Sequence, residues 1–536
     1  MQFLKGNALS KNLKDWNEKY FSKIDWKLLL FLLLLLNVKL IVKLFAILFI
    51  YFFNRNFKFG FRIRSSRLPL FYIAISIISI LDLFICKIFI DSQYMLVFVI
   101  GVGFWIISIL ALHQMKLFTE KLDANIIQST LIAFFIINAI VSFTDLLLII
   151  IETGSLNPFL YQGMYQKYFI GTGDYIKGIS FDISTTNALL NLFGVIYFFK
   201  RNLYSIAFLC TSILLLTGSN ISNILLIAAL LFLFIFHSTR EQKSVIVIFF
   251  LFIALFIVKI SPQNNQYVSD FFKKKFQKSS KPVAQKFSAQ KIKEQNEKKI
   301  VENNLDSEYA MLQQKGLLNL KTGNSDSKKP LIPKPNLNAI EYQNINDTNS
   351  FRKELIDFTK THKEDSASLT IKDEWQRTPG KLISMQQTIS FLELHPQKII
   401  TGNGMGCFSS KLAFRATALN LSGSYPKKYS YISHDFAKNH LSVFLYFFTK
   451  QKELHSITNT PDSVYNQLLG EYGVAGISAF LLFYIGFFIR KSKPLIDTFP
   501  FLFIMMSAFA FGYWFEQLSV VPFFELLMFM HSKKQN

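Results

Sequence analysis

Long apolar runs constrain this chain more than any other feature. A helix that crosses the hydrocarbon core of a bilayer needs about 20 consecutive apolar residues. A run at 28–53 provides one crossing or two short ones. The other runs near this length are 68–90, 94–112, 125–151, 179–199, 203–217, 221–237, 244–260, 463–489, 498–515 and 519–530. We therefore predict an all-α polytopic membrane protein with about 11–12 transmembrane helices and one large loop before the last three.

Basic residues set the predicted orientation. They collect in short stretches at 199–202, 238–243, 490–493 and 531–536. The positive-inside rule places these on the cytoplasmic side, which explains the net charge of +23 without a nucleic-acid partner. The large loop 261–462 then lies on the opposite side. The basic segment 54–67 is also expected in the cytoplasm, and Lys39 and Lys43 interrupt the first run, so a hairpin stays open as an alternative to a single crossing.

The large loop changes composition along its length. Residues 261–375 are rich in Lys, Gln, Asn and Ser and poor in aromatic and branched residues, so we predict a disordered or loosely helical insert there. Further along, Leu382, Met385, Ile389 and Leu392 have helical spacing and are expected to share one helix face. The predicted organisation is an N-terminal segment (1–67), a transmembrane bundle (68–260), the polar insert (261–375), a catalytic loop region (376–462) and C-terminal transmembrane helices (463–536).

A glycine-rich loop opens the second part of that region. Gly402, Gly404 and Gly406 alternate, and Lys411 and Arg415 follow them. Glycine lets backbone N–H groups approach a phosphate or sugar closely, although a plain turn between helices explains the same residues. The Lys and Ser spacing differs from that of a Walker loop. A guanidinium suits a phosphate, so the loop and its cations are candidates for a phosphate site.

The run 463–489 begins with a helix-start signal. Thr460 and Pro461 are typical of the cap and first position of a helix. Asp462 then falls in the first turn, where a carboxylate interacts favourably with the helix dipole. That preference alone accounts for an acidic residue here, and a functional role stays open.

Polar residues continue into the same predicted helix. Ser463, Gln467 and Glu471 recur every four residues and form one stripe, with Asn466 beside it. An ionisable group such as Glu471 at a membrane boundary is a functional candidate by default, and a structural partnership with a neighbouring amide or Arg is the alternative. Small residues beside the stripe, such as Gly473, allow another helix or a ligand chain to come close. The stripe therefore predicts a polar site at the outer membrane surface.

Two stretches, ITGNGMGCFSSKLAFRATAL (400–419) and DSVYNQLLGEYGVAGISAFLLF (462–483), together resemble the signature of the O-antigen ligase and O-antigen polymerase superfamily. The layout of many helices, one large loop and a few last helices is similar too. The resemblance implies an enzyme of the bacterial inner membrane with a periplasmic loop. It would move a glycan from undecaprenyl diphosphate to a hydroxyl of lipid A-core (a ligase) or of another lipid-linked repeat (a polymerase), without a cofactor or metal.

The chemistry that the resemblance implies needs a base for the acceptor hydroxyl. Asp462 stands where the family has a histidine, so the base would be a carboxylate. Three histidines of the loop are possible substitutes: His434, His440 and His455.

The departing diphosphate needs cations. Arg415 occupies the place of a loop arginine of the family. Asn220 replaces another family arginine near the start of 221–237, so Lys411 or Lys427 is expected to contribute. Asp182, at the start of the helix near 179–199, is expected either to contact sugar hydroxyls or to cap that helix.

The predicted site combines these residues. The catalytic candidates are Asp462, Glu471 and Arg415, and the substrate-binding candidates are Lys411, Ser463, Asn466, Gln467, Gly404, Gly406, Asn220 and Asp182. The expected partners are the lipid-linked glycan, its acceptor and membrane lipids. Ligase and polymerase stay open, as does a transporter of similar lipids, although a transporter favours internal repeats and polar helices near mid-membrane. A scaffold using the basic insert would leave the site residues unexplained.

Overall fold

The computed structural model describes residues 23–62, 66–85, 91–160, 172–261, 351–361, 378–421, 423, 425–449, 456–492 and 494–533. Every regular element within these ranges is a helix, so the all-α prediction is confirmed. Four helices are long and apolar enough to cross a membrane: Ser92–Lys121 (α5), Ala124–Thr153 (α6), Arg240–Ile260 (α10 and a π-helical end) and Val464–Lys491 (α20, a π-helical segment and α21). They are compatible with a membrane protein.

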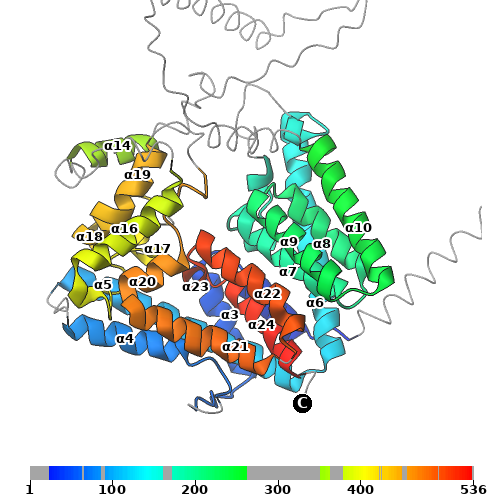
Figure 1. Cartoon of the computed structure of the whole chain (residues 1–536), viewed down its shortest axis with the longest axis horizontal. Helices are drawn as coiled ribbons and strands as arrows, with labels where there is room; N and C mark the ends of the chain where they lie inside the picture. The colour runs from blue at the N-terminus through cyan, green and yellow to red at the C-terminus, as the bar shows by residue number, and fades with distance from the viewer. Residues whose placement is uncertain are drawn as a thin grey trace, which may run out of the picture. The chain divides into compact units, whose positions relative to one another are not determined.

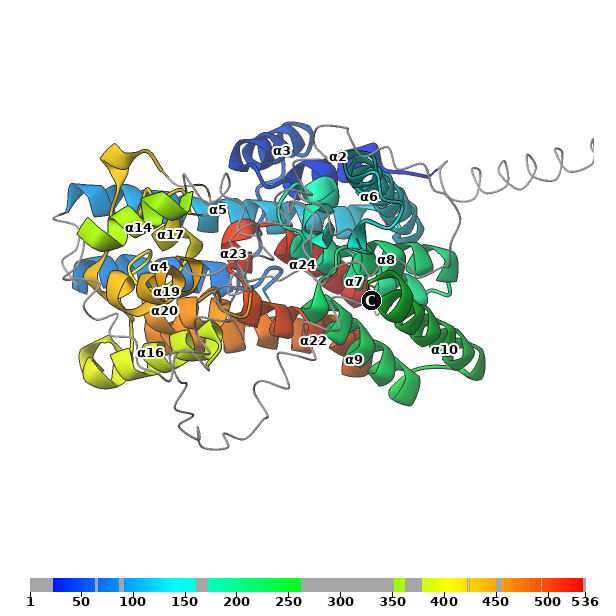
Figure 2. The same ribbon diagram turned by 90° about the horizontal axis from the view of Figure 1, so that it is seen from above.

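Shorter apolar helices make up the rest of the helical bundle. They are α2 (Trp26–Leu35), α3 (Leu40–Phe53), α4 (Phe71–Ile85), α7 (Ser184–Phe199), α8 (Tyr204–Leu216), α9 (Asn220–Phe236), α22 (Leu495–Ala508) and α24 (Val520–Lys533). Most of their ends lie within a few residues of the predicted runs, because the polar residues that interrupt each run also end the helix. Figures 1 and 2 both show α4 and α20 (Val464–Ala479) running side by side.

The first apolar run folds into a hairpin of two short helices. With 10 and 14 residues, α2 and α3 are about 15 and 21 Å long, which is less than the hydrocarbon thickness. Asp25 N–H donates to Thr130 Oγ1 near the start of α6 (3.0 Å), and Lys121 Nζ at the end of α5 donates to Asn54 Oδ1 (3.2 Å). Since α5 and α6 follow each other directly, both ends of the hairpin lie at the same end of these helices, so the structure selects the hairpin over the single crossing.

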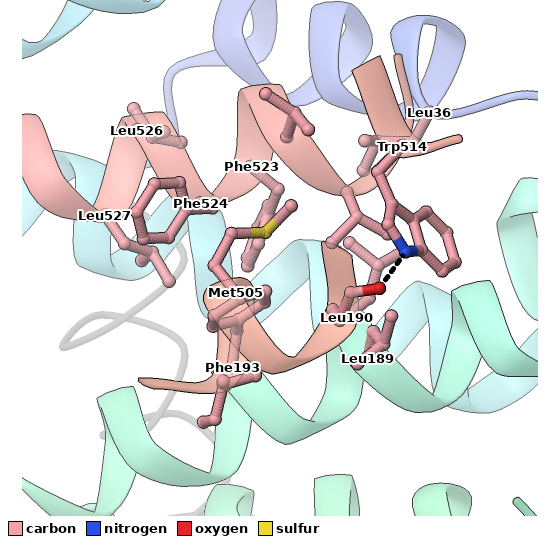
Figure 3. Close-up of a cluster of buried hydrophobic side chains, with 14 of the residues drawn as sticks. Leu36, Leu189, Leu190, Phe193, Met505, Trp514, Phe523, Phe524, Leu526 and Leu527 are labelled. Atoms are coloured by element: carbon pink, nitrogen blue, oxygen red, sulfur yellow. Dashed lines mark hydrogen bonds between the residues drawn. The ribbon is translucent and has the colours of Figure 1, made fainter. Parts of the chain in front are cut away.

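The C-terminal helices close the hydrophobic core. Helix α24 packs against α5, α7 and α22, and Figure 3 shows Phe523 and Phe524 of α24 near Phe193 and Met505. Between α22 and α24 lies the short helix α23 (Trp514–Gln517). Trp514 Nε1 donates to the Ala508 carbonyl at the end of α22 (2.7 Å). This bond spans the connection between α22 and α23 and holds α23 in place.

Short helices make up the described part of the large loop: α14 (Phe351–Thr361), α16 (Gly380–Leu394), α17 (Lys411–Ala416), α18 (His434–Phe436) and α19 (Ser442–Phe448). Helix α14 lies within 261–375, where we predict a disordered or loosely helical insert. Its Leu355 is buried in a cluster with Phe414, Phe436 and Leu445, so this segment does find an apolar partner. Residues 262–350 and 362–377 lie outside the described residues.

The helix predicted from Leu382, Met385, Ile389 and Leu392 is confirmed as α16, but its apolar side is mostly not the buried one. Leu382, Met385 and Ile389 are exposed, and of the predicted set only Leu392 is buried. The helix instead turns small polar residues inward, because Ser384 and Thr388 are hydrogen-bonded to side chains of neighbouring elements.

Candidate functional site

Helix α20 is interrupted at Gly473. This residue has φ 61° and ψ −159°, a conformation that is essentially restricted to glycine. Beyond the break, Val474 N–H donates to Ile399 O (2.8 Å) and Ala475 N–H to Ile400 O (3.0 Å). The segment 399–404 therefore supplies the carbonyl acceptors that an unbroken helix would have offered to these N–H groups. The small residues beside the polar stripe predicted the close approach of another helix or a ligand chain, and in the structure this loop is what comes close.

The glycine-rich loop bonds to the same helix from the other side of the break. Asn403 N–H donates to Gly470 O (2.9 Å) and Gly404 N–H to Glu471 O (3.1 Å). At Gly406, φ is 75° and an added Cβ would lie 2.7 Å from Val97 Cγ1. Gly404 and Gly406, predicted to bind substrate, thus make internal contacts that shape the loop.

Glu471 anchors this loop. Its side chain is completely buried, and Oε1 accepts hydrogen bonds from Phe408 N–H (3.3 Å) and Ser409 N–H (3.1 Å). The backbone donors that were expected to face a phosphate are therefore directed at a carboxylate of the protein itself. These contacts favour a positioning role for Glu471 over contact with substrate.

The start of α20 corrects the predicted cap. Ser463, not Thr460, is the N-cap, and its hydroxyl accepts from Tyr465 N–H (3.2 Å). Asp462 precedes the helix because Ser463 still has extended backbone geometry. Lys381 of α16 holds this segment: its Nζ donates to Thr460 O (3.1 Å) and to the carbonyl of Asp462. The backbone of Asp462 is thereby fixed while its side chain stays half-buried.

The other stripe residues are engaged inside the protein. Asn466 Nδ2 donates to Ser384 Oγ (3.0 Å), and Gln467 Nε2 donates to Glu516 Oε1 of α23 (3.0 Å). Ser463, Asn466 and Gln467 are all buried. The structure thus gives them packing and positioning contacts with α16 and α23.

The loop histidines have different surroundings. His440 is completely buried and hydrogen-bonded through Nε2 to Thr388 Oγ1 (3.1 Å). Burial lowers its pKa to about 3, so the ring is neutral. His434 is exposed at the start of α18, and His455 lies outside the described residues. Lys427 is also exposed, and its Nζ lies 3.9 Å from Oε1 of Glu354 in α14.

Charged side chains from five segments converge near α17. Lys411, at its first position, is 9% exposed and interacts electrostatically with Asp182, Arg415, Asp462 and Glu516. We call this group, together with Lys43 of α3, the charged cluster. It contains four of the predicted site residues. Asn220 is not among them: it begins α9, and no contact between its side chain and the cluster is found in the described parts of the chain.

Two members of the charged cluster were missed by sequence reasoning. Lys43 Nζ donates to Leu35 O (2.7 Å) and Leu518 O (3.2 Å), and it interacts electrostatically with Asp182, Lys411 and Arg415. A charge inside an apolar run was the available signal. Glu516 Oε2 accepts from Leu412 N–H (3.0 Å), which fixes α17 on α23.

Asp182 lies at the edge of the cluster. It does not cap α7, whose N-cap is Ile183. Its carboxylate accepts a hydrogen bond from Thr186 Oγ1 (2.9 Å), which leaves it as a partial counter-ion for Lys43 and Lys411.

Burial dominates the electrostatics of the charged cluster. It lowers the pKa of Lys411, an effect that Asp182 opposes and Arg415 reinforces. It raises the pKa of Asp462, although Lys381 and Lys411 oppose this rise. Burial also raises the pKa of Glu516 to about 7, against the opposing effects of Leu412 N–H, Arg415 and Lys411. The arrangement therefore combines desolvated cations with a half-buried carboxylate of increased basicity.

We expect Glu516→Gln to change the pH dependence of stability. The pKa of Glu516 is about 7 in the folded chain and about 4.5 ordinarily, so its contribution is fully present below pH 4.5 and is lost as the pH rises through 7. The shift corresponds to about 3 kcal/mol. Gln467 Oε1, which has no partner among the described residues, can accept a hydrogen bond from the new amide.

The measurement is the thermal unfolding midpoint of the purified chain at pH 5 and pH 7.5. The wild type should lose more stability between these pH values than the variant, and Glu393→Gln, at an exposed position of α16, should behave as the wild type. Equal losses in the wild type and Glu516→Gln would show that Glu516 does not titrate in this range.

Comparisons with protein-family models, with curated proteins and with solved structures give no match for this chain.

Proposed function

We propose that this chain is a membrane glycosyltransferase that moves a glycan from a polyprenyl diphosphate to an acceptor hydroxyl, as O-antigen ligases and polymerases do. One observation carries the proposal: Lys411 interacts electrostatically with Arg415 of the same helix and with Asp462, which directly precedes the N-cap of the long apolar helix α20. Cations suit a diphosphate leaving group, a carboxylate suits proton abstraction, and the position suits a substrate carried in a bilayer.

The proposed reaction is a displacement at the sugar carbon that bears the diphosphate. Asp462 takes the proton of the acceptor hydroxyl as its oxygen forms the new glycosidic bond. The bond between the sugar and the diphosphate breaks, and its electron pair leaves with the diphosphate, which Lys411 and Arg415 stabilise. The raised pKa of Asp462 makes it a better base than an exposed aspartate.

Two further residues act through the reacting groups. Lys381 fixes the backbone of Asp462, and Glu471 holds the loop that leads into α17. Neither contacts the proposed substrate, so both are positioning residues.

The proposed setting is the inner membrane of a bacterium, with α16–α19 on the periplasmic side. The hairpin α2–α3 then enters and leaves from the cytoplasmic side, which places residues 23–25 and 54–62 there and agrees with their basic residues. The acceptor is lipid A-core in a ligase and a second lipid-linked repeat in a polymerase.

A deletion strain tests the proposal. Its surface polysaccharide and lipid-linked intermediates are compared on gels after complementation with the wild type, Arg415→Ala, Asp462→Asn or Glu471→Gln. Loss of long glycan from lipid A-core with accumulation of lipid-linked polymer identifies a ligase, and accumulation of single repeats identifies a polymerase. An unaltered glycan profile in the deletion strain would refute the proposal, and full complementation by all three variants would refute the site.

A further inference from the structure

Lys43 lies near the tip of the α2–α3 hairpin, deep in the protein. Its side chain is 3% exposed. An ammonium group has three donors, and two of them serve the carbonyls of Leu35 and Leu518. Its third N–H has no acceptor among the residues that the structure describes.

The hairpin tip is bonded to the segments that carry the charged cluster. Val38 N–H donates to Ser180 O (2.8 Å), two residues before Asp182. Leu518, which binds Lys43, is two residues after Glu516, and Glu516 in turn binds the first turn of α17. These bonds hold Lys43 beside the segments that bear Asp182 and Lys411, and they explain its electrostatic interaction with both.

Three basic side chains, Lys43, Lys411 and Arg415, come together in this region. Asp182 interacts with both lysines, and Asp462 interacts with Lys411. Glu516 adds only part of a charge near pH 7. Lys411 is nine-tenths buried as a residue, and no hydrogen bond from its ammonium is found within the described ranges. A buried ammonium without a hydrogen-bond acceptor is costly, so Lys411 is suited to bind an anion.

We propose that Lys43 is the third cation of an anion site formed with Lys411 and Arg415, and that this site binds the diphosphate of a prenyl lipid. The inference rests on the proposed function, and it adds Lys43 as a residue that stabilises the negative charge formed during the reaction. A diphosphate esterified at both ends gains one negative charge when the sugar leaves. Lys43, held by backbone carbonyls, is positioned to stabilise that additional charge without moving.

The test is the binding of farnesyl diphosphate to the purified full chain in nanodiscs, measured by calorimetry. Lys43→Gln is the decisive variant, because its amide keeps two N–H donors for Leu35 O and Leu518 O while the charge is lost. We expect at least tenfold weaker binding, whereas Lys39→Gln, an exposed lysine four residues earlier, should change the affinity less than twofold. Size-exclusion chromatography verifies that each variant is folded.

Two competition arms identify the anion. Inorganic pyrophosphate should displace farnesyl diphosphate, and phosphatidylglycerol should not. Equal displacement by phosphatidylglycerol would overturn the diphosphate assignment in favour of a general lipid phosphate site.

Failure of this inference can be distinguished from failure of the proposed function. If wild-type affinity is retained in folded Lys43→Gln but lost in Arg415→Ala, the role of Lys43 is refuted and the transferase proposal stands. If the wild type binds no diphosphate, both are refuted.

Discussion

Gly473→Ala is expected to remove most of the correctly folded protein. Gly473 has a positive φ that other residues adopt only with strain, and an added Cβ would overlap the Ile399 and Ile400 carbonyls. Those carbonyls accept the hydrogen bonds of Val474 and Ala475, so the loop cannot move away without leaving buried donors unpaired. Strain and lost bonds together cost about 3 kcal/mol or more.

The measurement for Gly473→Ala is the monodisperse fraction on fluorescence-detected size exclusion, followed by thermal unfolding of what remains. Gly103→Ala in α5 is the matched control, because an added Cβ there meets no atom within 4 Å. It should give a wild-type profile. Wild-type yield and stability in Gly473→Ala would mean that α20 is continuous through this position.

Asp462→Asn is expected to reduce glycan transfer by a factor of about 10² to 10⁴. The amide cannot accept the proton of the acceptor hydroxyl. Lys381 binds the backbone carbonyl of residue 462, so the variant should keep the local fold. Binding of the donor should also be retained, because Lys411 and Arg415 are unchanged. A loss of rate at unchanged donor affinity therefore identifies a base.

The pH profile separates this role from a structural one. In the wild type, the rate should rise as Asp462 loses its proton, at a pH above the ordinary range for aspartate because its pKa is raised. It should fall again at high pH as Lys411, whose pKa is lowered, loses its proton. Asp462→Asn should lack the acidic limb. Glu393→Gln serves as the control, and an unchanged acidic limb in Asp462→Asn would assign the base to another group.

Local sequence patterns predicted much of the helical layout. Apolar runs located both ends of α6, α8 and α9 to within two residues, because a polar residue near each end closes both the run and the helix. Helix α5 continues nine residues beyond its predicted run. The apolar spacing also located α16, but it did not indicate which side of that helix would be buried. Its buried side includes Ser384 and Thr388, whose partners come from distant parts of the chain, and no local pattern contains that information.

The candidate site was predictable only in part for the same reason. Asp182, Lys411, Arg415 and Asp462 were proposed separately from their motifs, and the structure brings them together. The sequence did not indicate that the glycine loop would direct its N–H groups at Glu471. Membership of Lys43 in the cluster depends on the hairpin, and the sequence left the hairpin and a single crossing equally open.

Transfer by the purified chain in liposomes tests the central claim most directly. The donor is an oligosaccharide on a polyprenyl diphosphate, and lipid A-core or a second donor molecule is the acceptor. We expect a glycosylated acceptor and one released prenyl diphosphate per transfer with the wild type, and neither product with Asp462→Asn. Wild-type protein that is folded and binds the donor but transfers no glycan to either acceptor would contradict the central claim.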